Sequence, residues 1–135
     1  MLKSINTISL SLKTFTTVFI FFILSNAFTQ LNLDSISHLD YQALHSANLN
    51  DIWAYVDEFG NEYAIVGTTK GTSVVDLSDP NNPSEIFWLP GSESIWRDPK
   101  VYGDYAYITT EAEDGLAIID LTPLPSSNVL PTAVY

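Results

Sequence analysis

Residues 62–77 read EYAIVGTTKGTSVVDL, and residues 104–121 read DYAYITTEAEDGLAIIDL. Each stretch opens with an acid followed by Tyr-Ala, continues through a pair of threonines, and has a glycine five residues before its final Asp-Leu. The second copy is two residues longer, and the extra residues fall at its turn. The chain therefore contains two related units, each built from short apolar segments.

The spacing of these units predicts an all-β fold made of propeller blades. A repeat of roughly 40 to 50 residues made of short strands is typical of such blades, each of which has four antiparallel strands. The apolar runs at residues 64–66 and 116–119 do not alternate with polar residues. Strands covered on both faces have this pattern, whereas a strand with one wet face alternates. We expect about two four-stranded blades of an incomplete propeller.

Turn residues divide each unit into its strands. Residues 57–61 contain a Gly and an Asn suited to a tight turn, and residues 78–83 contain two prolines that interrupt a sheet ladder. In the first unit we expect strands at residues 51–56, 62–69, 72–77 and 85–89. In the second unit we expect them at residues 98–102, 104–110, 116–121 and 129–135. No segment after residue 30 has a helical period.

Residues 1–30 differ in charge and hydrophobicity from the two repeated units. Lys3 and Lys13 are their only charges, and the apolar core at residues 15–24 is far shorter than the ~20 residues that cross a bilayer. A basic start, a short apolar core and small residues after it are typical of a secretory signal peptide. We expect a signal-peptide helix at residues 1–29, a lead-in segment at 30–48, blade 1 at 49–92 and a truncated blade 2 at 93–135. Because two blades do not close a ring, we expect an N-terminal fragment of a longer protein.

Charge and cysteine content narrow the classes of function. The chain has 16 acids against five basic side chains, a net charge of −11. Such a surface repels phosphate backbones, so we expect no nucleic-acid partner. The chain has no cysteine, which excludes thiolate metal sites, cysteine nucleophiles and lipoprotein anchoring. The expected partner is an extracellular glycan or protein, with membrane contact only through export or a missing C-terminal anchor.

Four segments carry a family resemblance, namely LNDIWAYVDEFGNEYAIVG at 49–67, GTSVVDLSDPNNP at 71–83, SIWRD at 94–98 and DGLAIIDL at 114–121. Together they resemble the choice-of-anchor B family of exported bacterial proteins, and the Val-Val-Asp and Ile-Ile-Asp endings are similar to the LVIVD repeat of surface propellers. The resemblance implies a secreted or cell-surface propeller and no particular reaction. Pro99 departs from the family pattern. Because proline lacks a ladder donor, we expect its strand to start late or to be distorted.

Asp51 and Asp98 are the candidate site residues. They occupy equivalent positions at the start of the innermost strand of each unit. As functional residues they would line one mouth of the propeller channel and bind a cation or a sugar hydroxyl. As structural residues they would accept backbone N–H bonds that tie one blade to the next. The sequence leaves both interpretations open and assigns no catalytic, cofactor-binding or metal-binding residue.

Other acids are expected to serve the fold. Asp76 and Asp120 recur before the turn that follows the third strand, and we expect them to cap it. The loops at 57–62 and 111–114 are rich in oxygen ligands of the kind that calcium prefers, but neither has the spacing of a known calcium loop. Solvated turns are therefore favoured, and calcium is the one cofactor left open. Arg97 is expected to pair with an acid.

The histidines and tryptophans are the remaining candidates for a binding site. His38 and His45 are seven residues apart without nearby carboxylates in a metal-ligand pattern, so a zinc site is not expected. Trp53, Trp88 and Trp96 would stack sugars where exposed, whereas aromatic residues in strands more often pack between blades.

Three hypotheses of function follow. The first is a non-enzymatic, exported β-propeller module that binds, adheres or serves as a display scaffold. The alternative is a polysaccharide hydrolase or lyase with carboxylates at the channel mouth, since glycoside hydrolysis uses paired carboxylates. Asp51 and Asp98 facing each other across one pocket would favour the enzyme. A purely structural spacer is a third possibility.

Overall fold

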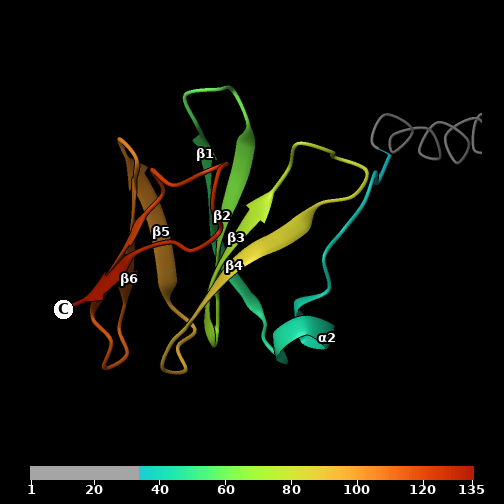
Figure 1. The fold of residues 1–135 in the computed structure, drawn as a ribbon. Helices are drawn as coiled ribbons and strands as arrows, with labels where there is room; N and C mark the ends of the chain where they lie inside the picture. The colour runs from blue at the N-terminus through green and yellow to red at the C-terminus, as the bar shows by residue number, and fades with distance from the viewer. Residues whose placement is uncertain (1–33) are drawn as a thin grey trace, which may run out of the picture. The chain divides into compact units, whose positions relative to one another are not determined.

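The computed structural model describes residues 34–135, of which Ile36–Tyr135 form one compact unit. The expected signal peptide at residues 1–29 lies outside the described residues. Two four-stranded antiparallel sheets make up nearly all of the unit, which confirms the all-β prediction and its blade-like sheets (Figure 1). The first sheet contains β1 (Leu49–Val56), β2 (Glu62–Thr68), β3 (Gly71–Asp76) and β4 (Ser84–Pro90). The second contains β5 (Arg97–Tyr102), β6 (Tyr105–Thr110), β7 (Leu116–Asp120) and β8 (Thr132–Val134).

Strands form where apolar runs are bounded by turn residues. Each sheet has its strands in sequence order, because each strand pairs antiparallel with the next strand along the chain. Gly60 and Gly103 adopt positive φ in the β1–β2 and β5–β6 turns, a conformation that glycine takes without steric cost. The observed strands begin and end within two residues of the expected bounds, apart from β8, which is shorter than the expected strand at 129–135.

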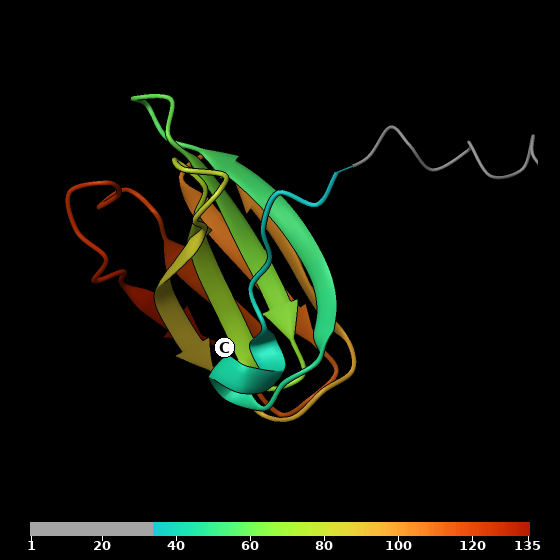
Figure 2. The same ribbon diagram turned by 90° about the vertical axis from the view of Figure 1, so that its right-hand side faces the viewer.

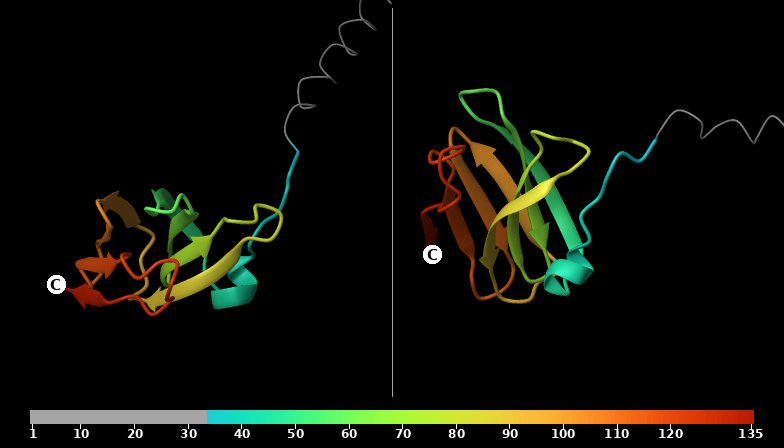
Figure 3. Two further views of the ribbon diagram at one scale, coloured as in Figure 1. Left: turned by 45° about the horizontal axis from the view of Figure 1, so that its top comes forward. Right: turned by 45° about the vertical axis from the view of Figure 1, so that its right-hand side comes forward.

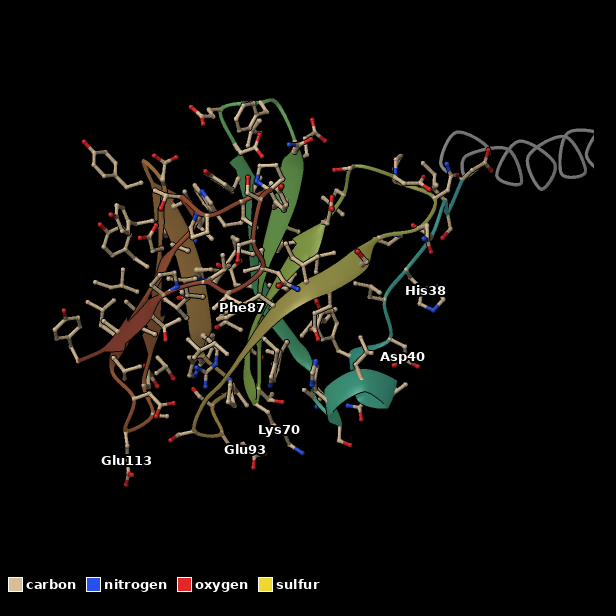
Figure 4. The ribbon with its side chains drawn as sticks, viewed as in Figure 1. His38, Asp40, Lys70, Phe87, Glu93 and Glu113 are labelled. Atoms are coloured by element: carbon tan, nitrogen blue, oxygen red, sulfur yellow. The ribbon has the colours of Figure 1, made fainter. Side chains whose placement is uncertain are left out.

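The main core lies between the two sheets (Figure 3). We call the sheet β1–β4 blade 1 and the sheet β5–β8 blade 2. The face of blade 1 that packs against blade 2 is its front face, which buries Tyr55, Tyr63, Ile65 and Val74. The face of blade 2 that receives it is its back face, which buries Ala106, Ile108, Ala117 and Ile119. Phe87 lies in the middle of the molecule in Figure 4 and packs partly buried against this core. Burial of these side chains supplies most of the free energy that joins the blades.

Gly67 allows the closest approach between the blades. A Cβ atom at this position would overlap the carbonyl oxygen of Arg97 and would touch the ring of Pro99. Both of those residues belong to β5, which lies beside β1 and β2. Glycine is therefore required in β2 because a neighbouring backbone occupies the space of a side chain.

The lead-in segment packs on the opposite face of blade 1, which we call its back face. Its helix α2 (Tyr41–His45) was not expected from the sequence. Asp40 caps this helix by accepting hydrogen bonds from the backbone N–H groups of Gln42 and Ala43. Tyr41 is buried against the strands, and Leu39 packs beside it, so the lead-in packs along blade 1. Figure 2 shows the lead-in crossing this face of the sheet.

The expected distortion at Pro99 is wrong. Pro99 lies within β5 and pairs with Ile108 in an unbroken register. β5 is an edge strand, so one side of its backbone has no strand partner in the sheet. The carbonyl oxygen of Pro99 accepts a hydrogen bond from Lys100 Nζ, which places this residue's backbone groups on the free edge. A proline there removes no ladder hydrogen bond.

Candidate functional site

Asp51 joins the two blades rather than standing free. Its Oδ2 accepts a hydrogen bond from Lys100 Nζ at 3.0 Å, across from β1 to β5. The ammonium group of Lys100 also lies 4.4 Å from the ring centroid of Trp53, within the range of a cation–π interaction. The backbone N–H of Ile52 and the ammonium of Lys100 lower the pKa of Asp51. Asp51 is thus an ionised partner in a contact between blades.

Asp98 lines a separate hollow of about 250 Å³. The hollow is lined by Trp96, Asp98, Thr109, Thr110 and Glu111, and Asp51 is not among these residues. Trp96 is 58% exposed as a residue. An accessible aromatic face, two carboxylates and two hydroxyl groups therefore share one small concave surface, which we call the Trp96 hollow.

The side chain of Arg97 contacts blade 1. Its guanidinium is buried, donates from Nε to the carbonyl oxygen of Thr68 at 3.0 Å, and donates to the carbonyl oxygen of Ser92. Burial lowers the pKa of Arg97, and the carboxylate of Asp114 opposes this effect. Asp114 lies 4.0 Å from the guanidinium and accepts hydrogen bonds from the backbone N–H and the hydroxyl of Ser92. The expected pairing of Arg97 with an acid is confirmed.

The repeated acids before the turns act as caps, as expected. Asp76 accepts a hydrogen bond from the N–H of Ser78 at 2.8 Å. Asp120 accepts hydrogen bonds from both the N–H and the hydroxyl of Thr122. Each is therefore a local acceptor for a turn, with one carboxylate oxygen engaged.

The acidic loops are organised around internal hydrogen bonds. Asp57 is buried and accepts hydrogen bonds from the N–H groups of Phe59 and Asn61, from the Asn61 amide and from the Tyr63 hydroxyl. Burial and the charges of Asp57 and Asp76 raise the pKa of Tyr63 to about 12. In the second loop Glu113 stands at the tip, pointing away from the sheets (Figure 4). Within residues 34–135 no group of three acidic or histidine side chains is arranged to hold a metal ion.

The two sheets coincide with the two segments that match a known family model. The LVIVD repeat model matches residues 50–89 and 96–132, which include most of both blades. The chain belongs to the LVIVD repeat family. No curated protein and no solved structure gave a match.

The two LVIVD repeats can be compared position by position from their strand registers. Ile52 pairs with Val66 as Pro99 pairs with Ile108, so Asp51 and Asp98 are equivalent, as predicted. Their surroundings differ because Asp51 binds Lys100 of the second repeat, whereas Asp98 lines the Trp96 hollow. Gly67 of the first repeat corresponds in register to Thr109 of the second, a lining residue of the Trp96 hollow.

Sequence reasoning missed a cluster around His45. Its Nε2 lies 2.8 and 2.9 Å from the two carboxylate oxygens of Glu85, and its ring stacks on Trp88 at 3.6 Å between centroids. Ser73 also donates to Glu85 at 2.7 Å. The sequence around His45 gives no sign of this carboxylate. Glu85 lies 40 residues away in the chain, and no local motif links the two.

A larger hollow of about 700 Å³ lies on the back face of the first LVIVD blade. Its floor is formed by Ala64, Val66 and Val75, and the lead-in forms one wall with Leu39 and Tyr41. In the part of the chain that the structure describes, no helix is long and apolar enough to cross a membrane.

Proposed function

We propose that this chain is a glycan-binding LVIVD module and that the Trp96 hollow is its binding surface. The observation that carries the proposal is the exposed indole of Trp96 beside Asp98, Glu111 and two threonine hydroxyls in one hollow. An aromatic face can stack against a sugar ring, and carboxylates and hydroxyls accept and donate hydrogen bonds to its hydroxyl groups. The hollow is shallow and suits one or two sugar units of a longer chain.

The charge of the surface narrows the glycan class. The chain has a net charge of −11, and Asp98 and Glu111 add two carboxylates at the hollow itself. Uronic acids and sulfated sugars would be repelled, whereas neutral hexose polymers and amino sugars would not. The proposed ligand is therefore a neutral or amino-sugar polysaccharide.

Binding to a glycan array followed by calorimetry tests the proposal. The Trp96→Ala variant should lose at least about tenfold in affinity, because the loss of one stacked aromatic group costs roughly 1.4 kcal/mol or more. Phe59→Ala is the matched control, since Phe59 is 69% exposed but lies in the β1–β2 turn outside the hollow. Unchanged affinity in Trp96→Ala, or an equal loss in Phe59→Ala, would overturn the proposal.

A second candidate is hydrolysis of the bound glycan. Asp98 and Glu111 line the same hollow, and glycoside hydrolysis uses two carboxylates on opposite sides of the scissile bond. Release of reducing ends that disappears in both Asp98→Asn and Glu111→Gln would establish this activity. Binding without release would leave the module non-enzymatic.

The proposal also includes export of the protein from the cytoplasm. The basic residues, short apolar core and small residues of the first 29 positions support secretion, and the four segments at 49–121 support a bacterial surface protein of the choice-of-anchor B type. A fusion of residues 1–30 to a reporter active only outside the cytoplasm tests it. The fusion should be active, and Phe21→Asp, which breaks the apolar core, should abolish that activity.

A further inference from the structure

A hollow of about 330 Å³ lies between the two blades, and we call it the interblade hollow. Blade 1 forms one wall with Tyr63, Asp76 and Ile86, and the loop between β7 and β8 forms the other. Both walls therefore belong to the described chain. The hollow shares no lining residue with the Trp96 hollow. Its volume is at the low end of the range for ligand pockets, which suits one small molecule.

The carboxylate of Asp76 has an oxygen available to a ligand in this hollow. Its Oδ1 accepts a hydrogen bond from the N–H of Ser78, whereas its Oδ2 makes no hydrogen bond to any residue within 34–135. Asp76 is half-buried, so part of its hydration is lost as well. A carboxylate oxygen in this position favours a ligand group that donates hydrogen bonds.

The charge around the hollow favours a cation. Burial, followed by the charges of Asp57 and Asp76, raises the pKa of the Tyr63 hydroxyl to about 12. Both carboxylates therefore act on a side chain that lines the hollow. No lysine or arginine occurs in the four loops at this end of the sheets, at residues 57–61, 77–83, 103–104 and 121–131. A positively charged ligand is thus attracted here without opposition from a basic side chain of these loops.

The remaining lining residues suit a sugar ring. Residues 126–128, Ser-Ser-Asn, place two hydroxyls and an amide at the hollow. These groups can donate hydrogen bonds to sugar hydroxyls and accept hydrogen bonds from them. Ile86, Leu124 and Pro125 add apolar surface that can contact the C–H groups of the ring.

We propose that the interblade hollow binds an amino sugar, whose ammonium group pairs with Asp76 and whose hydroxyls contact residues 126–128. Hydrogen bonds to a charged group are stronger than those between neutral groups, so the ammonium group dominates recognition. The site goes beyond the proposed glycan surface, because it lies on other residues and does not require the Trp96 hollow.

Titration of the nitrogen-15-labelled full chain with glucosamine at pH 6, where its amine is protonated, tests the proposal. We expect saturable shifts of the amide resonances of residues 126–128. Glucose has a hydroxyl in place of the ammonium group and should bind at least about tenfold more weakly. Lysine has an ammonium group but no sugar ring, and it should also bind at least about tenfold more weakly.

Three variants locate the site. Asp76→Asn removes the charge but retains an oxygen that can cap the turn, and it should weaken glucosamine binding at least about tenfold. Asp120→Asn is the matched control, because Asp120 caps the equivalent turn of blade 2 and does not line the hollow. Asn128→Lys, a change at an exposed residue away from the Asp76 turn, introduces a competing ammonium group and should also abolish binding.

Three outcomes would overturn the proposal. The first is the absence of saturable binding, or equal binding of glucose or lysine, because the hollow would then not recognise an amino sugar. The second is an equal loss of binding in Asp76→Asn and Asp120→Asn. The third is loss of glucosamine binding in Trp96→Ala, which should leave it unchanged, because the amine would then bind in the Trp96 hollow. Failure of the Trp96 hollow to bind glycans would not affect this test.

Discussion

Gly67 is a residue whose identity is set by a neighbouring blade. Any side chain there would overlap the backbone of Arg97 and meet the ring of Pro99. Neither contact is visible in the local sequence, where Gly67 simply interrupts an apolar strand. Thr109, which stands at the equivalent place in blade 2, is exposed in the described part of the chain.

Gly67→Ala adds only one methyl group, but it should destabilise the fold by more than a change of that size usually does. Backbone atoms cannot move aside as a flexible side chain can, so we expect a loss of about 1–3 kcal/mol in the free energy of unfolding. Urea unfolding followed by tryptophan fluorescence measures it. Thr109→Ala is the control and should change the free energy by less than about 0.5 kcal/mol. Equal effects at both positions would mean that the close approach does not constrain the fold.

The hydrogen bonds of Asp57 let us predict how acid affects the stability of the fold. Burial raises the pKa of this carboxyl, but hydrogen bonds from Asn61, Phe59 and Tyr63 outweigh burial and lower it below its ordinary value. A lowered folded-state pKa means that the stabilisation is complete above about pH 4 and is lost as the pH falls through the folded-state pKa. Asp57→Asn should be less stable at pH 7 and should lose less further stability between pH 5 and pH 2.

Urea midpoints measured across that pH range test this prediction. Glu58→Gln, an exposed change in the same turn, is the control and should keep the acid sensitivity of the wild type. If Asp57→Asn lost stability in acid as steeply as the wild type, the dependence would come from other carboxyls.

At the scale of the element, the strands were predictable and the helix was not. Apolar runs bounded by Gly, Pro, Asn and Asp are local signals, so the strands were placed within two residues apart from β8. Helix α2 has five residues, too few for a helical period to register. It depends on the cap at Asp40 and on contacts of Tyr41 and His45 with strands far away in the chain.

The candidate site was predictable only in part, because local sequence signals identify equivalent positions but not the contacts around them. The repeat identified Asp51 and Asp98 as equivalent positions, which the registers confirm. What surrounds them depends on the next blade: Lys100 binds Asp51, whereas Asp98 is left in a hollow with Trp96. A sequence pattern within one repeat carries no information on such contacts between repeats.

Helix α2 should be sensitive to its cap. Asp40→Ala removes the acceptor for the N–H groups of Gln42 and Ala43, and loss of such a cap costs about 0.5–2 kcal/mol. A helix of five residues has little propensity of its own to compensate. Amide hydrogen exchange of Leu44 and Ser46 should accelerate by about 2- to 30-fold, while the amides of β2 keep their protection.

The matched control for the helix is Asp79→Ala. Asp79 is an exposed acid that accepts the N–H of Asn81 in the β3–β4 turn, so its loss should leave exchange in α2 unchanged. Faster exchange in α2 in the control, or unchanged exchange in Asp40→Ala, would show that packing rather than the cap maintains the helix.

At the scale of the whole molecule, the two blades share one core. Ile108 of blade 2 is fully buried in the same cluster as Tyr63 and Ile65 of blade 1. Hydrogen bonds from Arg97 to Thr68 and from Lys100 to Asp51 add polar contacts across the junction. In repeat proteins, stability is the sum of the stability of each unit and that of each interface. A defect in the interface must therefore lower the stability of both blades.

Ile108→Ala tests this coupling. Removal of a fully buried isoleucine side chain costs about 2–5 kcal/mol. Because the cavity lies between the sheets, the amides of β2 should lose as much hydrogen-exchange protection as those of β6, in a single cooperative unfolding transition. Ile95→Ala, a change at a side chain that is 70% exposed, should alter neither. If only β6 lost protection, blade 1 would be stable without its neighbour, and burial of its front face would not be what stabilises it.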